Sequence, residues 1–328
     1  MKHVSMVIPE GDVVLGSVVG PVMILNWANE VLAAQGLPGA YTVDVVGTGA
    51  EKPTDRGIFA IRPNRRFNEL ERTDLVLIPA FSGNPMLSIA KNTEAIAWIQ
   101  RMKGQGAEVA SMCTGAFLLA ATGLIDGQSC TTHWAVAGLF RQAFKNVDLR
   151  EERIVTDANG FYSSGGAFSY LSLVMHLLQK FNGPEMAVLA AKTYEVEMGR
   201  HSQNMFMVFQ GMKDHGDEQV LKAQSLMEMR YAEPLNMETI ASELALSARN
   251  FNRRFKEATA LTPLDYLQRV RIEAAKRQLE SGANVNEAMY ASGYSDDKAF
   301  RSVFKRRTSM SPVHYRARYA RAPLSVAA

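Results

Sequence analysis

The chain has 328 residues, of which 47% are hydrophobic and 21% are charged, and its formal net charge is +3. This length exceeds one typical domain and the apolar fraction is ordinary for soluble protein, so we expect two folded domains. Two cysteines, Cys113 and Cys130, exclude a disulfide scaffold and are not at zinc-ligand spacing, so we expect a reducing compartment, no metal and no cofactor.

The N-terminal residues lack the long apolar run of a signal peptide, because charge and glycine interrupt it early. No uncharged apolar run of about 18 residues suggests a membrane span. We therefore expect a cytoplasmic protein that has no contact with a membrane.

The first 205 residues alternate short apolar runs with amphipathic segments. This pattern predicts strands at 4–8, 41–46, 74–79 and 107–112, and helices at 22–34 and 93–102. A strand pair or hairpin is expected at 155 and 161–163, followed by helices at 167–180 and 184–197. Strands that are apolar throughout and alternate with helices indicate a three-layer α/β domain with a flavodoxin-like parallel sheet.

One of these strands runs into Cys113, Thr114 and Gly115 and then directly into a helix. Such an elbow would hold the Cys113 thiol at the top of the sheet, where the helix N-terminus favours a thiolate. His133 follows twenty residues later and could lie beside it. On spacing alone, a buried cysteine that only packs is the alternative.

Residues 206–219 contain an acidic cluster around Gly216 and are predicted to link this domain to a second one. The second domain is expected to occupy residues 220–320, with its first helix at 220–230. It should be entirely α-helical.

Within the second domain a pattern of about 49 residues occurs twice, as two helix-turn-helix units at about 236–267 and 285–316. The repeat pairs Phe251 with Phe300, and Ser247 and Ser295 are the expected N-caps of the second helices. From residue 249 onward the chain has 16 Lys and Arg against seven Asp and Glu. Two basic helices at matched spacing predict nucleic-acid binding, and a solvated basic face on a helical bundle is the alternative.

These residues resemble the AraC/XylS family of bacterial transcriptional regulators, through the run 247–256, the turn 293–296 and the segment 311–316. The resemblance implies that a long middle helix joins the two units and that both second helices enter successive major grooves of double-stranded DNA. It also implies a contact with RNA polymerase. Carried over residue by residue, the base-reading positions are Arg249, Asn252, Arg253, Asp297, Lys298, Arg301 and Ser302.

The first domain resembles the ThiJ/PfpI branch of the class I glutamine amidotransferase-like superfamily, through the runs 113–117, 120–127 and 132–134. In relatives that have chemistry the cysteine is the nucleophile, and an acidic residue precedes a Gly-Pro pair by three positions. Here that position is Ser17, and a second acidic position aligns with Ser172. Without these acids, hydrolysis or hydration lacks a base and an orienting group.

We therefore predict a sequence-specific transcriptional regulator, active as a homodimer, whose first domain senses a small metabolite and lacks full catalytic machinery. The alternatives are a Cys-dependent amidase or hydratase tethered to a DNA-binding domain, and a redox sensor that uses Cys113. The expected ligand-binding residues are Cys113, Thr114, His133, Trp134, Ser17 and Gly166.

Overall fold

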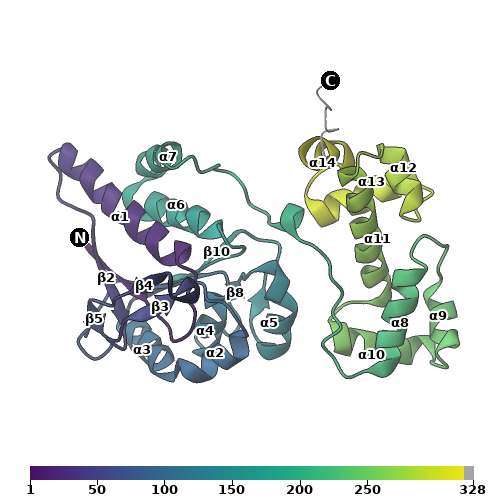
Figure 1. Ribbon diagram of the computed structural model, residues 1–328, viewed down its shortest axis with the longest axis horizontal. Coiled ribbons are helices and arrows are strands. Elements are labelled where there is room, and N and C mark those ends of the chain that lie inside the picture. The colour runs from purple at the N-terminus through teal and green to yellow at the C-terminus, as the bar shows by residue number, and fades with distance from the viewer. Residues whose placement is uncertain (321–328) are drawn as a thin grey trace. The chain divides into compact units, whose positions relative to one another are not determined.

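The computed structural model describes residues 1–320 of the chain. The chain divides into two compact units, with unit 1 ending at Gln203 and unit 2 beginning at Asn204 (Figure 1).

Unit 1 is built on a seven-stranded sheet in the order β10-β11-β7-β6-β1-β2-β5. The strands are β1 (Lys2–Val7), β2 (Tyr41–Gly47), β5 (Arg65–Arg66), β6 (Leu75–Ile78), β7 (Glu108–Met112), β10 (Val155–Ala158) and β11 (Phe161–Ser164). All neighbours are parallel except β10, which pairs antiparallel with β11. The predicted parallel sheet and its terminal hairpin are confirmed.

Helices cover both faces of this sheet, which confirms the three-layer α/β prediction (Figure 1). Residues of α1, α6 and α7 form one core with the sheet, and residues of α3, α4 and α5 form the other. The helices are α1 (Gly16–Ala34), α2 (Pro85–Lys91), α3 (Thr93–Gly104), α4 (Gly115–Ala121), α5 (Ala137–Ala143), α6 (Ser169–Asn182) and α7 (Pro184–Thr193). The smaller elements are β3 (Lys52–Thr54), η1 (Asp55–Gly57), β4 (Phe59–Ile61), β8 (Ser129–Cys130), η2 (Trp134–Val136) and β9 (Asp148–Leu149).

Helix α1 begins at Gly16, so the predicted start at residue 22 was wrong. Pro21 lies inside the helix, where it has no backbone N–H to donate to the Ser17 carbonyl. A Cβ atom at Gly20 would lie 2.4 Å from the Tyr170 ring, so only glycine lets α1 approach α6 this closely. By length and composition α1 could also cross a membrane, but its apolar residues such as Ile24 are buried in the sheet core.

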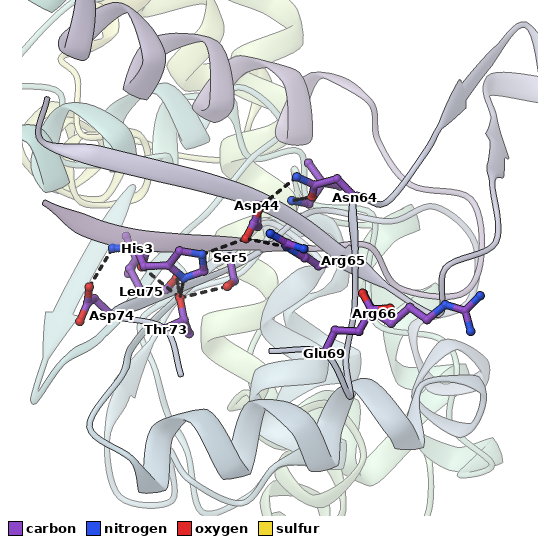
Figure 2. A network of polar contacts seen from close by, with 11 residues as sticks. His3, Ser5, Asp44, Asn64, Arg65, Arg66, Glu69, Thr73, Asp74 and Leu75 are labelled. Atoms are coloured by element: carbon purple, nitrogen blue, oxygen red, sulfur yellow. Dashed lines mark hydrogen bonds and ion pairs between the residues drawn. The ribbon is translucent and has the colours of Figure 1, made fainter. Parts of the chain in front are cut away.

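A polar network links β1, β2 and the start of β6 at the end of the sheet opposite to the Cys113 elbow. His3 contacts the Thr73 hydroxyl and the Asp44 carboxylate through its two ring nitrogens, each at 3.0 Å, and Ser5 donates to Thr73 (Figure 2). This is a hydroxyl–imidazole–carboxylate chain. The Thr73 side chain is buried, however, and its hydroxyl also bonds the backbone carbonyl of His3 at 3.0 Å. The network therefore stabilises the sheet rather than forming a nucleophile.

Unit 2 is entirely helical in the part that the structure describes. Its helices are η3 (Asn204–Phe206), α8 (Glu218–Met229), α9 (Met237–Glu243), α10 (Ala248–Thr259), α11 (Pro263–Glu280), α12 (Val285–Ala291), α13 (Asp297–Thr308) and α14 (Pro312–Tyr319). Helices α9 and α10 form the first helix-turn-helix unit, α12 and α13 form the second, and α11 belongs to the cores of both.

The second helix of each helix-turn-helix unit begins at a side-chain N-cap. The Ser247 hydroxyl accepts from the Asn250 amide and caps α10, as predicted. Helix α13 is capped by Asp296, which accepts from the Ala299 amide at 2.7 Å, so the predicted cap at Ser295 was wrong. The 49-residue offset itself pairs Ser247 with Asp296, and a carboxylate caps as well as a hydroxyl.

Residues 204–213, which we call the strap, include the first part of the predicted linker, and they pack on unit 2. Asn204 donates to the Ser309 hydroxyl at the C-terminal end of α13, at 3.2 Å. The Phe209 ring packs edge-on against Tyr266 near the start of α11, with 5.1 Å between ring centroids. The strap therefore contacts both the second helix-turn-helix unit and the start of α11.

Candidate functional site: the Cys113 elbow and the two reading helices

Cys113 forms the turn between β7 and α4, as the sequence predicts. Its backbone φ of +55° lies in the left-handed region, which a non-glycine residue adopts at some cost and which is typical of a nucleophile elbow. The Cys113 amide donates to the Ser164 carbonyl and its carbonyl accepts from the Thr132 hydroxyl, at 2.9 and 2.8 Å. A Cβ atom at Gly115 would lie 2.6 Å from the Pro79 carbonyl oxygen, so the tight turn requires glycine there.

The thiol of Cys113 is neutral at physiological pH. Burial raises its pKa to about 11, although hydrogen bonding to Thr114 acts in the opposite direction. The expected thiolate was therefore wrong, because desolvation outweighs the effect of the short helix α4. Burial also raises the pKa of Cys130, to about 12. Within residues 1–320 no cluster of three or more His, Cys, Asp or Glu residues could hold a metal ion.

His133 is held at the same corner of the sheet by its neighbour Thr132, which bonds to Cys113. Its Nδ1 atom accepts from the Ala135 amide at 3.0 Å, and its ring lies 5.1 Å from the Trp134 ring. Burial lowers the pKa of His133, so the imidazole is neutral. Among residues 1–320 no hydrogen bond joins His133 to Cys113.

Two hydroxyls at the elbow are occupied by the backbone. Ser17 donates to the Val14 carbonyl at 2.7 Å and accepts from the Ala80 amide at 2.9 Å, and it has no exposed surface. The Thr114 hydroxyl exchanges two hydrogen bonds with the backbone of Phe81, at 2.7 and 2.8 Å. These side chains hold the loops around the elbow in place.

Gln203, which sequence reasoning missed, joins the loops at the same corner of the sheet by side-chain hydrogen bonds. Its side-chain amide donates to the carbonyls of Thr132 and Glu151, at 3.0 and 2.6 Å, and its side-chain carbonyl accepts from the Gly166 amide at 3.1 Å. The side chain is 2% exposed. A Cβ atom at Gly165 would lie 2.6 Å from it, so the glycine pair makes room for this residue. No local sequence signal marks a lone glutamine of this kind.

In α10, the first of the two predicted reading helices, the predicted base readers Arg249, Asn252 and Arg253 are exposed. The Arg253 guanidinium donates to both Glu257 oxygens at 3.0 and 2.8 Å. It also donates to the Asn250 side chain at 3.0 Å. The Arg253 side chain is thus paired within its own helix, whereas the Arg249 side chain has no partner in the described chain.

In the second reading helix, α13, the four predicted readers lie on the outer side of the helix. Arg301 donates to both Asp297 oxygens, at 2.7 and 2.8 Å, so two of the predicted readers are paired with each other. Lys298 and Ser302 are exposed.

Polar contacts hold the second unit against the start of α11. Arg307 at the end of α13 forms an ion pair with Asp265, and Arg306 donates to the Gln268 side chain at 3.0 Å. Asp265 also pairs with Arg269 on its own helix. These contacts fix the second reading helix relative to the helix that joins the two units.

Two parts of the chain match known families. Residues 18–180 match the DJ-1/PfpI family, and residues 240–318 match a helix-turn-helix domain family. The first match covers every strand of the sheet except β1 and includes the Cys113 elbow, and the second covers both α10 and α13.

The similar proteins include transcriptional regulators. The HTH-type transcriptional regulator GbdR of Pseudomonas aeruginosa is 23% identical over 77% of this chain and 68% of its own length. The HTH-type transcriptional regulator GlxA of Rhizobium meliloti is 28% identical over 67% of this chain and 68% of its own length. An AraC family transcriptional regulator from Pseudomonas putida has the same fold over 59% of this chain and 100% of its own, with a TM-score of 0.50 and 13% identity.

Proposed function

We propose that a small metabolite bound at the Cys113 elbow controls this chain, which is a DNA-binding transcriptional regulator that joins a DJ-1/PfpI domain to an AraC-type helix-turn-helix domain. The ligand would lie against Cys113, His133, Trp134 and Gly166. A neutral thiol and a neutral imidazole suit non-covalent recognition of a metabolite better than attack on it. Ser17 and Thr114 would act by holding the surrounding loops.

The observation that carries this proposal is the position of Gln203. It bonds the loop that bears His133 and the turn that bears Gly166, and the next residue, Asn204, begins the strap on unit 2. A ligand that moves either loop must change the hydrogen bonds of Gln203. The altered position of Gln203 would then affect Asn204, at the start of the strap. The free energy available for this effect cannot exceed the difference in the ligand's binding free energy between the two conformations.

On DNA, we propose that the exposed residues of α10 and α13 read base edges in successive major grooves. The readers would be Arg249, Asn252, Arg253, Asp297, Lys298, Arg301 and Ser302. We further propose that the chain acts in the cytoplasm as a homodimer on repeated half-sites and that it contacts RNA polymerase. The composition of the reading helices, the helix-turn-helix match and the AraC resemblance support these steps.

A thermal-shift screen tests the sensor. Wild type and Cys113→Ser are heated with small amines and amino acids, and each hit is then added to the protein on an operator selected from random DNA. A ligand at 100 times its Kd should stabilise its domain by about 2.7 kcal/mol. A hit that stabilises both proteins, is recovered unchanged and alters operator affinity supports a non-covalent sensor. A complete lack of sequence preference on DNA would instead remove the regulator.

A Cys-dependent amidase or hydratase is the second candidate, and the left-handed backbone of Cys113 is the observation that favours it. Turnover of an amide or glyoxal-type substrate that vanishes in Cys113→Ser would establish it. The redox sensor is weaker, because oxidation proceeds through the thiolate and burial raises the pKa of Cys113 to about 11. DNA binding that is insensitive to peroxide would exclude that role.

A further inference from the structure

A cavity in unit 1 lies apart from the Cys113 elbow. It has a volume of about 150 Å³ and lies among α6, β10 and the segment 196–201, which leads to Gln203. Its apolar lining includes Met175, which is buried, and Val196. A cavity of about this size holds a ligand of roughly six to eight non-hydrogen atoms.

Most of the polar side chains that line this cavity are exposed, and several have no partner in the described chain. His176 is bonded to Asp157 at 2.8 Å. By contrast, five lining side chains form no hydrogen bond or ion pair within residues 1–320. These are Arg153, Ser172, Gln179, Glu197 and His201.

We propose that this cavity binds a small amino carboxylate. The guanidinium of Arg153 presents paired donors that match a carboxylate. Glu197 supplies the complementary charge for an ammonium group and opposes a ligand with two negative charges. The apolar surface of Met175 and Val196 takes a short aliphatic chain.

The cavity lies beside residues 201–203, the last residues of unit 1, so a bound ligand would influence their position. Arg153 and Ser202 form a β-bridge, and the His201 carbonyl accepts from the Ile154 amide at 3.2 Å. The Arg153 carbonyl also accepts from the Gln203 side chain, at 3.3 Å. A ligand held between Arg153 and Glu197 therefore spans the two segments whose pairing positions Gln203.

Methionine labelling tests the site directly, because Met175 and Met198 line it. Spectra of full-length protein with ¹³C-methyl methionine are recorded with 2-aminobutyrate, butyrate and butylamine, and the two signals are assigned with Met175→Leu and Met198→Leu. We expect 2-aminobutyrate to shift both signals, butyrate to act at least fivefold more weakly, and butylamine to have no effect.

The variants identify the recognising groups. Arg153→Gln should weaken binding of 2-aminobutyrate at least tenfold and Glu197→Gln at least fivefold. Arg150→Gln is the matched control, since Arg150 pairs with Asp148 and does not line the cavity, and its affinity should equal that of wild type. Shifts at neither methionine, or equal Kd values for wild type, Arg153→Gln and Glu197→Gln, would overturn the site. This readout does not depend on a ligand at the elbow or on DNA.

Discussion

Arg254, in the first reading helix α10, donates hydrogen bonds of 2.8 and 2.7 Å to the carboxylate of Asp217. Asp217 also caps α8, accepting from the amides of Gln219 and Val220. The basic face that the sequence suggests for α10 is therefore divided, because Arg254 fastens the helix to α8 while Arg249 and its neighbours stay exposed.

Replacing Asp217 should destabilise unit 2. Asp217→Ala removes an N-cap and an ion pair together, and we expect the free energy of unfolding to fall by about 1–2 kcal/mol. Urea unfolding measures this. Asp214→Ala is the control, because Asp214 is exposed and has no side-chain partner in the described chain, and it should change stability by no more than about 0.5 kcal/mol. Equal effects of the two substitutions would contradict the role of Asp217.

The same pair predicts a pH dependence. The hydrogen bonds from Arg254 are the largest of the influences that hold the pKa of Asp217 below its ordinary value. A carboxyl whose pKa is lowered by folding stabilises the folded state above its unfolded pKa of about 3.9 and loses that contribution as the pH falls through the folded value. The stability difference between wild type and Asp217→Ala should therefore be constant from pH 5 to 7 and shrink below about pH 4.

Arg253 should contribute to sequence recognition despite its pairing with Glu257. Both side chains are about 60% exposed, so their ion pair is worth only about 0.3–0.5 kcal/mol. A bidentate contact with a base is worth about 1–3 kcal/mol and can displace it. Arg253→Ala should weaken binding to a selected operator by about 1–3 kcal/mol, measured by fluorescence anisotropy. An equal loss on random DNA would show a phosphate contact instead, and Glu257→Ala should not weaken binding on either DNA.

Much of the fold follows from local pattern. Strand β6 is apolar along its whole length, β7 is buried after Glu108, and Ser247 stands where a helix N-cap is required. Such signals are complete within a few residues, so the positions of the strands and the helix-turn-helix repeat could be predicted. The elbow at Cys113 could be predicted for the same reason, because a strand, a small-residue turn and a helix follow each other directly.

The features that sequence reasoning missed depend on contacts between distant residues. The close approach of α1 to α6 depends on Tyr170 packing against Gly20, and the protonation of Cys113 depends on how deeply the folded chain buries it. Gln203 bonds to residues 37 to 72 positions away. The acidic cluster around Gly216 predicted a linker, yet the strap that precedes it is mostly apolar, and its bonding partners, such as Ser309, lie far along the chain.

The thiol of Cys113 should react slowly at neutral pH. With a pKa raised by burial to about 11, only about one thiol in a thousand is ionised at pH 8. Iodoacetamide alkylation, followed by mass spectrometry of the 113-containing peptide, should accelerate about tenfold per pH unit from pH 7 to 9. Cys113→Ser controls for Cys130, whose pKa of about 12 makes it slower still. A rate that is already maximal at pH 7 would reveal a thiolate and favour the enzyme.

Gln203→Ala should lower the stability of unit 1 and abolish the response of unit 1 to DNA bound at unit 2. The change leaves the Gly166 amide and the carbonyls of Thr132 and Glu151 without their partner, so we expect a loss of stability of about 1–3 kcal/mol. Thermal unfolding measures that loss. Gln100→Ala is the control, since Gln100 bonds a single distant carbonyl in the same unit, at 2.9 Å.

The disconnection is tested by hydrogen exchange, with and without a selected operator, and needs no known effector. Because the influence of two sites on each other is reciprocal, DNA bound to unit 2 should alter exchange at residues 131–134 and 165–166 in wild type. Gln100→Ala should retain this response, whereas Gln203→Ala should lose it even where it remains folded and binds the operator. A response that persists in Gln203→Ala, or that is absent in wild type, would show that the signal does not pass through the hydrogen bonds that Gln203 makes to these loops.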